Sequence, residues 1–147
     1  MIIKSIDQLN SFSKKVADHI KEKDCIFLIG EIGVGKTTFT KLLINYLQRK
    51  DNLKPSEVLS PTFNLLYEYD LKKFKIMHYD LYRLKEEKEL RNLGIFKDNQ
   101  NAIKIIEWPN LIKIPITDKL EIYLNYTKGD NERELKLVGT GKWKNFK

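Results

Sequence analysis

The sequence predicts an α/β fold in which a mostly parallel central sheet carries additional antiparallel strands. Two observations support this prediction. In the first half of the 147-residue chain, helix-like segments flank a short apolar segment typical of a buried parallel strand. In the second half, aromatic and β-branched segments follow one another and end in an alternating pair around a short turn. The chain shows no internal repeat or low-complexity linker, so we expect one domain over residues 1–147.

The first half predicts a helix, a strand and a second helix. Ser5 and Gln8 have the spacing of a capping box, and apolar residues then recur every three or four positions up to Ile20. The run CIFLI at residues 25–29 is continuously apolar, as in a strand that is buried on both faces. Residues 36–48, KTTFTKLLINYLQ, again place apolar side chains on one helical face.

The second half predicts strands and one short helix. Strands are expected over residues 62–70, 74–80, 102–107, 119–126 and 133–139. A helix closed by Gly94 is expected over residues 85–94. The last two strands alternate around the turn TKGDN and therefore predict a hairpin.

The composition is that of a globular protein with a basic surface. The 27 basic and 20 acidic residues give a net charge of +7, which attracts nucleotides, RNA or acidic proteins without choosing among them. No apolar run approaches the roughly 18 residues of a membrane span, and the N-terminus lacks a signal-peptide pattern. Cys25, the one cysteine, lies in an apolar run, as a buried side chain would. We expect a cytoplasmic protein without membrane contact.

A glycine-rich segment follows the strand predicted at residues 25–29. Gly30, Gly35, Lys36 and Thr37 satisfy the pattern G-x-x-x-x-G-K-[ST] in full. The glycines let backbone N–H groups converge on phosphate oxygens, and the next helix directs its positive end to the same place. The lysine is expected to contact the β- and γ-phosphates, and the threonine hydroxyl to hold Mg²⁺. The sequence thus predicts a nucleoside triphosphate site in a P-loop NTPase-like three-layer sandwich.

Two acidic residues are candidates for the carboxylate that such a metal site takes from a second strand. Glu107 ends the run AIKIIE, and Asp80 ends the run KIMHYD. Because strand ends face the ligand crevice in sheets of this kind, either acid fits the role. In the loop LSPTF, the hydroxyl of Ser60 or Thr62 either senses the γ-phosphate or serves an X-Pro turn.

Three classes of P-loop protein compete for this pattern. A GTPase is discounted because TKGD lies in a predicted hairpin turn and because LYRL, without the expected glycine, follows Asp80. A small-metabolite kinase needs an arginine-bearing lid, and the arginines do not cluster in the sequence: Arg49, Arg83, Arg91 and Arg133. The main hypothesis is a small ATPase that acts on a partner. The alternatives are the metabolite kinase and a nucleotide-gated binding module with negligible hydrolysis.

Five segments together resemble one family. In order and spacing, GEIGVGKTTFTKLL, SPTFNLLYEY, HYDLYRL, LGI and IIEW are similar to the TsaE (YjeE-like) P-loop ATPases, over essentially the whole chain. The resemblance implies an ATPase that serves the bacterial formation of threonylcarbamoyladenosine at position 37 of tRNAs reading A-starting codons. It also implies partners: a threonylcarbamoyl transferase subunit and its inactive paralogue, a heterodimer of TsaD/TsaB type, with tRNA contacted indirectly. ATP and Mg²⁺ are the implied cofactors, and hydrolysis is expected to be weak without the partners.

The resemblance also assigns roles to residues. It implies that Thr37 and Glu107 hold Mg²⁺, which decides provisionally between the two acids. Asp80 resembles the family's acid near the γ-phosphate and becomes a candidate for orienting the attacking water. Thr62 matches the switch-like loop, so the implied catalytic residues are Asp80, Lys36 and Thr62. Trp108 and Arg133 resemble residues beside the nucleotide. The implied phosphate cradle comprises Gly33, Val34, Gly35, Lys36, Thr37 and Thr38.

Three features remain outside this pattern. The first helix lacks the family's usual threonine, so we expect the adenine contact near Ser5 and Ile6. His78 is interpreted as a packed or half-exposed side chain rather than a catalytic one. The basic segment GKWKNFK at the C-terminus either stacks on RNA bases or is a frayed, solvated tail.

Overall fold

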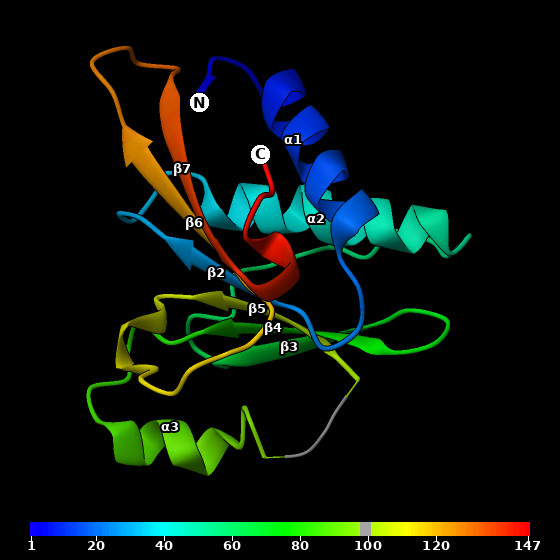
Figure 1. The fold of residues 1–147 in the computed structure, drawn as a ribbon, viewed down its shortest axis with the longest axis vertical. Helices are drawn as coiled ribbons and strands as arrows, with labels where there is room; N and C mark the ends of the chain where they lie inside the picture. The colour runs from blue at the N-terminus through cyan, green and yellow to red at the C-terminus, as the bar shows by residue number, and fades with distance from the viewer. Residues whose placement is uncertain (98–100) are drawn as a thin grey trace.

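The computed structural model describes residues 1–97 and 101–147, and these residues form a seven-stranded sheet with helices on both faces (Figure 1). The strands are β1 (Ile2–Ile3), β2 (Cys25–Ile29), β3 (Leu66–Asp70), β4 (Lys75–Asp80), β5 (Ile103–Glu107), β6 (Lys119–Tyr126) and β7 (Arg133–Thr140). The helices are α1 (Ile6–His19), α2 (Lys36–Lys50), α3 (Glu87–Leu93) and two 3-10 turns, η1 (Pro109–Leu111) and η2 (Gly141–Trp143).

The sheet is mostly parallel, as predicted. Its strand order is β1-β7-β6-β2-β5-β4-β3. The central strands β6, β2, β5 and β4 run parallel to one another. Antiparallel β7 joins one side and antiparallel β3 the other, and the short β1 pairs with β7 at the edge. The predicted fold class, with its late hairpin of β6 and β7, is therefore confirmed.

The helices complete three layers, because α1 and α2 pack together on one face of the sheet and α3 lies on the other (Figure 1). The Phe12 ring of α1 lies 5.7 Å from the Phe39 ring of α2. Helix α1 begins as predicted, since the Ser5 hydroxyl accepts the Gln8 N–H at 3.2 Å. Helix α3 ends at Gly94 in the left-handed conformation.

The largest error in a predicted boundary is at the start of β3. The strand expected from residue 62 begins only at Leu66, because the chain before it turns. The Leu65 N–H donates to the Pro61 carbonyl at 2.6 Å, and Leu65 has a φ of 66°. The turn has a consequence for the site, since it holds Thr62 close to the end of β4 instead of extending it along β3.

Cys25 is buried, as expected, with 2% of its surface exposed, in an apolar cluster that includes Phe27, Tyr79 and Ile106. Burial raises the pKa of its thiol to about 12, opposed by the positive charges of Lys104 and Lys119. A neutral thiol packed against the sheet is a small apolar side chain without redox chemistry of its own.

Both predictions for the C-terminal segment are wrong for its tryptophan. Trp143 is completely buried, with its ring centroid 4.6 Å from His19 of α1 and 5.0 Å from Phe146. The segment returns to the α1 side of the sheet (Figure 1), and Lys142 pairs with the buried Asp24. A side chain in this position stabilises the fold and does not offer its face to a base.

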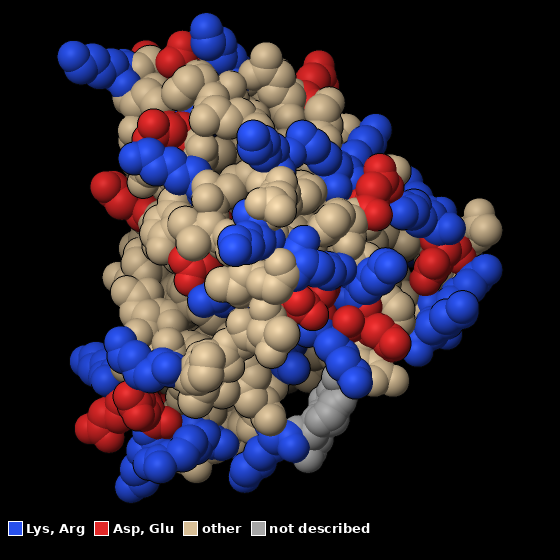
Figure 2. All heavy atoms as spheres, viewed as in Figure 1, with Lys and Arg blue, Asp and Glu red and all other residues tan. Residues whose placement is uncertain are grey.

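Basic side chains are spread over the face shown in Figure 2, and acidic side chains lie among them. On this face, the basic side chains are therefore not gathered in one patch. Among residues 1–97 and 101–147, no helix combines the length and apolar character that crossing a membrane requires.

Candidate nucleotide-binding site

Three parallel strands end at the same edge of the sheet and bring the predicted residues together. Strand β2 runs into the glycine turn, β4 ends at Asp80 and β5 ends at Glu107. The two acids are paired in register across β4 and β5. This edge is where ligands bind in open α/β sheets.

The glycine turn needs its glycines for two different reasons. A Cβ at Gly30 would overlap the carbonyl oxygen of Leu124 on β6, so this position has no room for a side chain. Gly35 has a φ of 123°, a conformation that other residues rarely adopt. Helix α2 then begins without a capping side chain, and its first N–H groups have no partner within the helix. These donors, with the positive end of the helix, suit an anion.

Lys36 lies against the turn rather than in solvent, with 5% of its surface exposed. Its ammonium donates to the carbonyl oxygens of Gly30 at 2.6 Å and Glu31 at 2.9 Å. It also lies 4.4 Å from the centroid of the Trp108 ring. Burial lowers the pKa of Lys36, while the charges of Glu107 and Asp80 act to raise it. These two carbonyl oxygens accept hydrogen bonds that the Lys36 ammonium could otherwise donate to phosphate oxygens.

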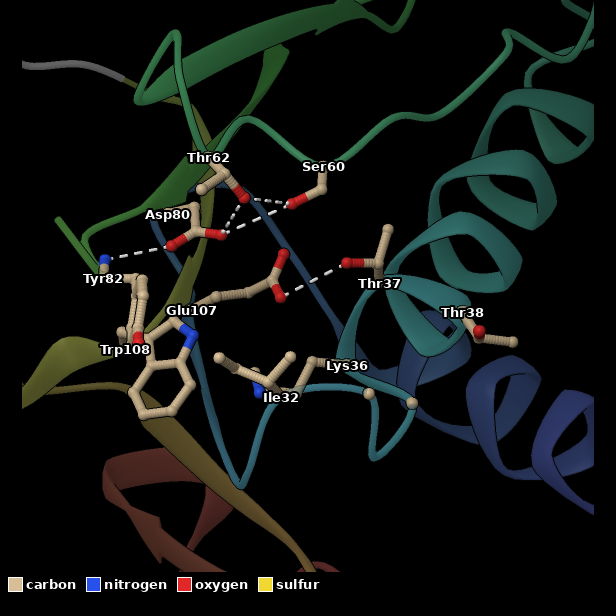
Figure 3. Close-up of a pocket in the computed structure, with 12 residues that line it drawn as sticks. Ile32, Lys36, Thr37, Thr38, Ser60, Thr62, Asp80, Tyr82, Glu107 and Trp108 are labelled. Atoms are coloured by element: carbon tan, nitrogen blue, oxygen red, sulfur yellow. Dashed lines mark hydrogen bonds between the residues drawn. The ribbon is translucent and has the colours of Figure 1, made fainter.

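Glu107 and Thr37 form the part of the site that fits a magnesium ion. The Thr37 hydroxyl donates to Glu107 Oε1 at 3.4 Å, so two hard oxygen ligands from α2 and β5 face each other (Figure 3). Among the described residues, no group of three or more His, Cys, Asp or Glu gathers in ligand geometry. A hydroxyl and one carboxylate are nevertheless a donor set that Mg²⁺ accepts when phosphates and water complete its shell.

Asp80 is held by a loop and by its own turn. The Thr62 hydroxyl donates to Asp80 Oδ2 at 3.1 Å, and the Ser60 hydroxyl lies 3.4 Å from the same oxygen. The Tyr82 N–H donates to Oδ1 at 3.0 Å (Figure 3). The hydroxyl oxygens of Ser60 and Thr62 are also within hydrogen-bond distance of each other, at 2.8 Å. The switch-like loop is thus hydrogen-bonded directly to the acid at the end of β4.

Most of the predicted residues line one pocket of about 290 Å³. Its lining comprises Ile32, Gly33, Gly35, Lys36, Thr37, Thr38, Ser60, Thr62, Asp80, Tyr82, Glu107 and Trp108. Trp108 directly follows β5 with a φ of 59°, and its ring centroid lies 4.8 Å from that of Tyr82. The two rings form an apolar wall beside the acids (Figure 3).

Val34 and Arg133 lie outside this pocket. Both line a neighbouring hollow of about 400 Å³, which shares Gly33, Gly35 and Thr38 with the pocket and also includes Ser5 and Ile6. The Val34 side chain is buried, and its N–H donates to the Glu31 carbonyl at 3.2 Å. Arg133 Nε donates to the Val34 carbonyl at 3.0 Å. Arg133 therefore contacts the back of the glycine turn from β7.

Besides Ile32 of the glycine turn, two residues of this region were not predicted as site residues. His78 is completely buried, and its Nε2 lies 2.7 Å from Glu107 Oε2. The alternation of β4 was the available signal, since His78 and Asp80 are two residues apart and share a face of the strand. Tyr82 had no comparable signal, because it follows the strand in irregular structure.

Comparison with known families gives a match over nearly the whole chain. The family described as threonylcarbamoyl adenosine biosynthesis protein TsaE matches residues 3–135. The chain belongs to the TsaE family. The family inferred from the five sequence segments is confirmed. Proteins of this family bind nucleotides, which agrees with the pocket.

Individual TsaE proteins are similar over similar lengths. The protein from Rickettsia prowazekii named tRNA threonylcarbamoyladenosine biosynthesis protein TsaE is 35% identical over 133 residues, covering 90% of this chain and 89% of the relative. The protein of the same name from Aquifex aeolicus is 33% identical over 137 residues and covers 93% of both chains. The crystal structure of Bacillus subtilis YdiB has a TM-score of 0.70 at 24% identity, covering 98% of this chain and 86% of YdiB. That structural likeness supports the α/β fold described above.

The TKGD segment does not line the pocket described above. Residues 127–130 lie in the turn between β6 and β7, as the sequence predicted. The Thr127 hydroxyl accepts the Gly129 N–H at 3.2 Å within that turn. The segment therefore serves the hairpin.

Proposed function

We propose that the protein binds ATP with Mg²⁺ in this pocket and hydrolyses it as an accessory subunit in threonylcarbamoyladenosine formation. The modified position is nucleotide 37 of tRNAs that read A-starting codons. One observation carries the proposal: the glycine turn, Lys36, Thr37, Asp80 and Glu107 converge from α2, β4 and β5 on one pocket. Membership of the TsaE family supplies the biosynthetic context.

The glycine turn and the start of α2 bind the phosphates in this proposal. The N–H groups from Gly33 to Thr38 and the ammonium of Lys36 donate to phosphate oxygens. Lys36 then exchanges its two carbonyl acceptors for phosphate, which requires little movement because it already lies at the pocket. Val34 contributes its N–H only if the turn releases the Glu31 carbonyl.

Thr37 Oγ1 and Glu107 Oε1 would hold Mg²⁺, since they are the facing oxygen ligands. When bound, the ion supplies charge neutralisation on the β- and γ-phosphate oxygens. Asp80 lies beside Glu107 in the sheet, and its carboxylate orients the attacking water. The Thr62 hydroxyl contacts the γ-phosphate, so the position of its loop depends on whether that phosphate is bound. Trp108 covers Lys36 and limits its access to water.

The base and sugar occupy the neighbouring hollow in this proposal. That hollow continues from the shared turn residues to Ser5 and Ile6 at the start of α1. Arg133 acts on nucleotide binding by holding the Val34 carbonyl and hence the shape of the turn.

The proposed partners are the transferase subunit and its inactive paralogue, with tRNA contacted through them. The relatives from Rickettsia and Aquifex carry names that place them in biosynthesis of a tRNA nucleoside, which supports a role within that machinery. ATP turnover would then be coupled to the state of the heterodimer, and we expect it to be slow in the isolated subunit.

The test is ATP hydrolysis with Mg²⁺ by the protein alone and with the heterodimer. We expect the partners to stimulate hydrolysis strongly. We expect Lys36→Ala to abolish hydrolysis by removing a phosphate contact, and Glu107→Ala to abolish it by removing a metal contact. Lys41→Ala, an exposed lysine on the same helix, is the matched control and should keep full activity. Full activity in either site variant would contradict the site assignment. Equal rates with and without partners, or phosphorylation of a small molecule, would favour the kinase alternative.

A further inference from the structure

We propose that His78 is a positioning residue that holds Glu107 in the orientation needed to bind Mg²⁺. This inference rests on the proposed function, because it concerns the carboxylate assigned there to the metal. The observation behind it is a contact between two buried polar side chains on neighbouring strands: His78 Nε2 on β4 lies 2.7 Å from Glu107 Oε2 on β5.

Among the described residues, the contact with Glu107 is the side-chain hydrogen bond that His78 makes. His78 is paired in register with Tyr67 on β3 and Ile105 on β5, so its ring stands on the face of the sheet that α2 covers. None of its surface is exposed, and its Nδ1 has no hydrogen-bond partner among the described residues. Burying an imidazole costs free energy, and the hydrogen bond between Nε2 and Glu107 is the contact that offsets this cost.

The contact defines which atom carries the proton. A metal-binding carboxylate is ionised and only accepts hydrogen bonds, so in the proposed site a neutral His78 ring donates from Nε2 and leaves Nδ1 bare. This assignment agrees with the surroundings of Nδ1, where no donor among the described residues is within hydrogen-bond distance. The inference therefore predicts the Nε2–H tautomer for His78.

The contact also divides the two oxygens of Glu107 between two tasks. Oε2 accepts from His78 on the core side, and Oε1 faces the Thr37 hydroxyl and the pocket (Figure 3). Glu107 is 2% exposed, so rotation about its side-chain bonds would break the His78 contact within the core. Fixing one oxygen thus fixes the direction of the other. Hydrogen bonds to metal-binding side chains from the next layer of residues commonly change metal affinity 10- to 100-fold.

A purely structural role predicts a different outcome. If His78 served only core packing, its replacement would lower stability and leave the Mg²⁺ dependence of nucleotide binding unchanged. The informative pair of variants is His78→Leu, which removes the donor, and His78→Gln, whose side-chain amide can still donate to Glu107 Oε2. His19→Leu, at the other histidine of the chain, controls for replacing an imidazole far from the pocket.

The measurement is the Mg²⁺ concentration at half-saturation for binding of a fluorescent, non-hydrolysable ATP analogue. For His78→Leu we expect this concentration to rise about 10- to 100-fold, with unchanged analogue binding in EDTA. His78→Gln should lie closer to the wild type than His78→Leu does. In a Glu107→Gln background, His78→Leu should add no further shift. A folded His78→Leu variant whose Mg²⁺ midpoint stays within about twofold of the wild type overturns the inference.

A second measurement decides the matter if His78→Leu does not fold. Nitrogen NMR of the wild-type protein reports the tautomer of each imidazole, and comparison with His19→Leu assigns the two rings. Protonation at Nε2 of His78 supports the inference, and protonation at Nδ1 with a bare Nε2 overturns it. If the wild type binds no nucleotide at any Mg²⁺ concentration, the proposed function fails, and the tautomer still tests the His78–Glu107 contact separately.

Discussion

Asp80 has both of its carboxylate oxygens engaged by neighbours. One oxygen accepts the Tyr82 N–H, and the other accepts the hydroxyl of Thr62. The orientation of the carboxylate is therefore set before any ligand binds. Because Thr62 lies in the loop between α2 and β3, the same hydrogen bond links the position of that loop to the acid. A group held in this way is suited to orienting a water molecule.

Asp80→Asn tests this role with little change in shape. The amide keeps an oxygen for the Tyr82 N–H but loses the negative charge, so we expect kcat to fall about 10²- to 10⁴-fold. Nucleotide affinity should change much less, because the glycine turn and Lys36 remain. Steady-state kinetics and analogue binding measured on the same preparation separate the two quantities. Asp70→Asn, at the exposed end of β3, is the control. An unchanged kcat would remove Asp80 from the reaction.

Elements specified by local patterns were predictable from the sequence. The Ser5 cap, the apolar run 25–29 and the glycine at the end of α3 each act within a few residues, and the structure has the corresponding elements. Elements that depend on distant partners were missed. β1 has two residues and forms only because β7 accepts it, and the start of β3 depends on the Leu65 turn.

The C-terminal turn η2 shows the same limit of local reasoning. The segment GKWKNFK is rich in lysine and read alone resembles a solvated tail. Its tryptophan is nevertheless completely buried between α1 and the sheet, where His19 and Phe146 contact it. Alternation within seven residues cannot reveal a contact that joins positions 19 and 143. We therefore expect this element to stabilise the whole fold.

Trp143→Ala should lower the free energy of unfolding by about 3–5 kcal/mol, the usual cost of removing a buried aromatic side chain. Trp143→Phe should cost less, because it keeps a ring in the core and removes an indole N–H that has no partner among the described residues. Urea denaturation followed by circular dichroism measures both. Lys144→Ala, exposed on the same segment, should stay within about 0.5 kcal/mol of the wild type. A loss below about 1 kcal/mol for Trp143→Ala would contradict its structural role.

At the scale of the whole molecule, the sequence predicted the site in outline. The glycine motif indicated its chemistry directly, and the ends of two apolar runs indicated Asp80 and Glu107. Residue pattern left the choice of metal carboxylate open. Our proposal assigns the metal to Glu107, because the Thr37 hydroxyl faces this carboxylate while Asp80 accepts a hydrogen bond from Thr62 in the loop. The choice between the two acids depends on which strands are neighbours in the sheet, and a local sequence pattern does not contain that information.

Exposed apolar and aromatic side chains lie on the segments that form the pocket. Ile32 of the glycine turn is 67% exposed, Phe63 after Thr62 is 82% exposed, and Tyr82 is 50% exposed. Arg83 lies over the Phe63 ring at 5.2 Å from its centroid. Exposed aromatic and arginine side chains of this kind are typical of the residues that dominate protein–protein binding. We expect the transferase heterodimer to cover this surface.

Phe63→Ala should therefore separate partner binding from catalysis. Hydrolysis by the isolated protein should be unchanged, because the Phe63 side chain does not line the pocket. The heterodimer concentration that gives half-maximal stimulation should rise about 30-fold, as expected for a loss of about 2 kcal/mol at a central interface residue. Phe96→Ala, which follows α3 and lines a different pocket, controls for loss of an exposed ring and should leave stimulation intact. If Phe63→Ala is stimulated at wild-type heterodimer concentrations, the partner binds elsewhere and its effect reaches the pocket through the fold. If Phe96→Ala is the variant that loses stimulation, the docking surface lies on the α3 side.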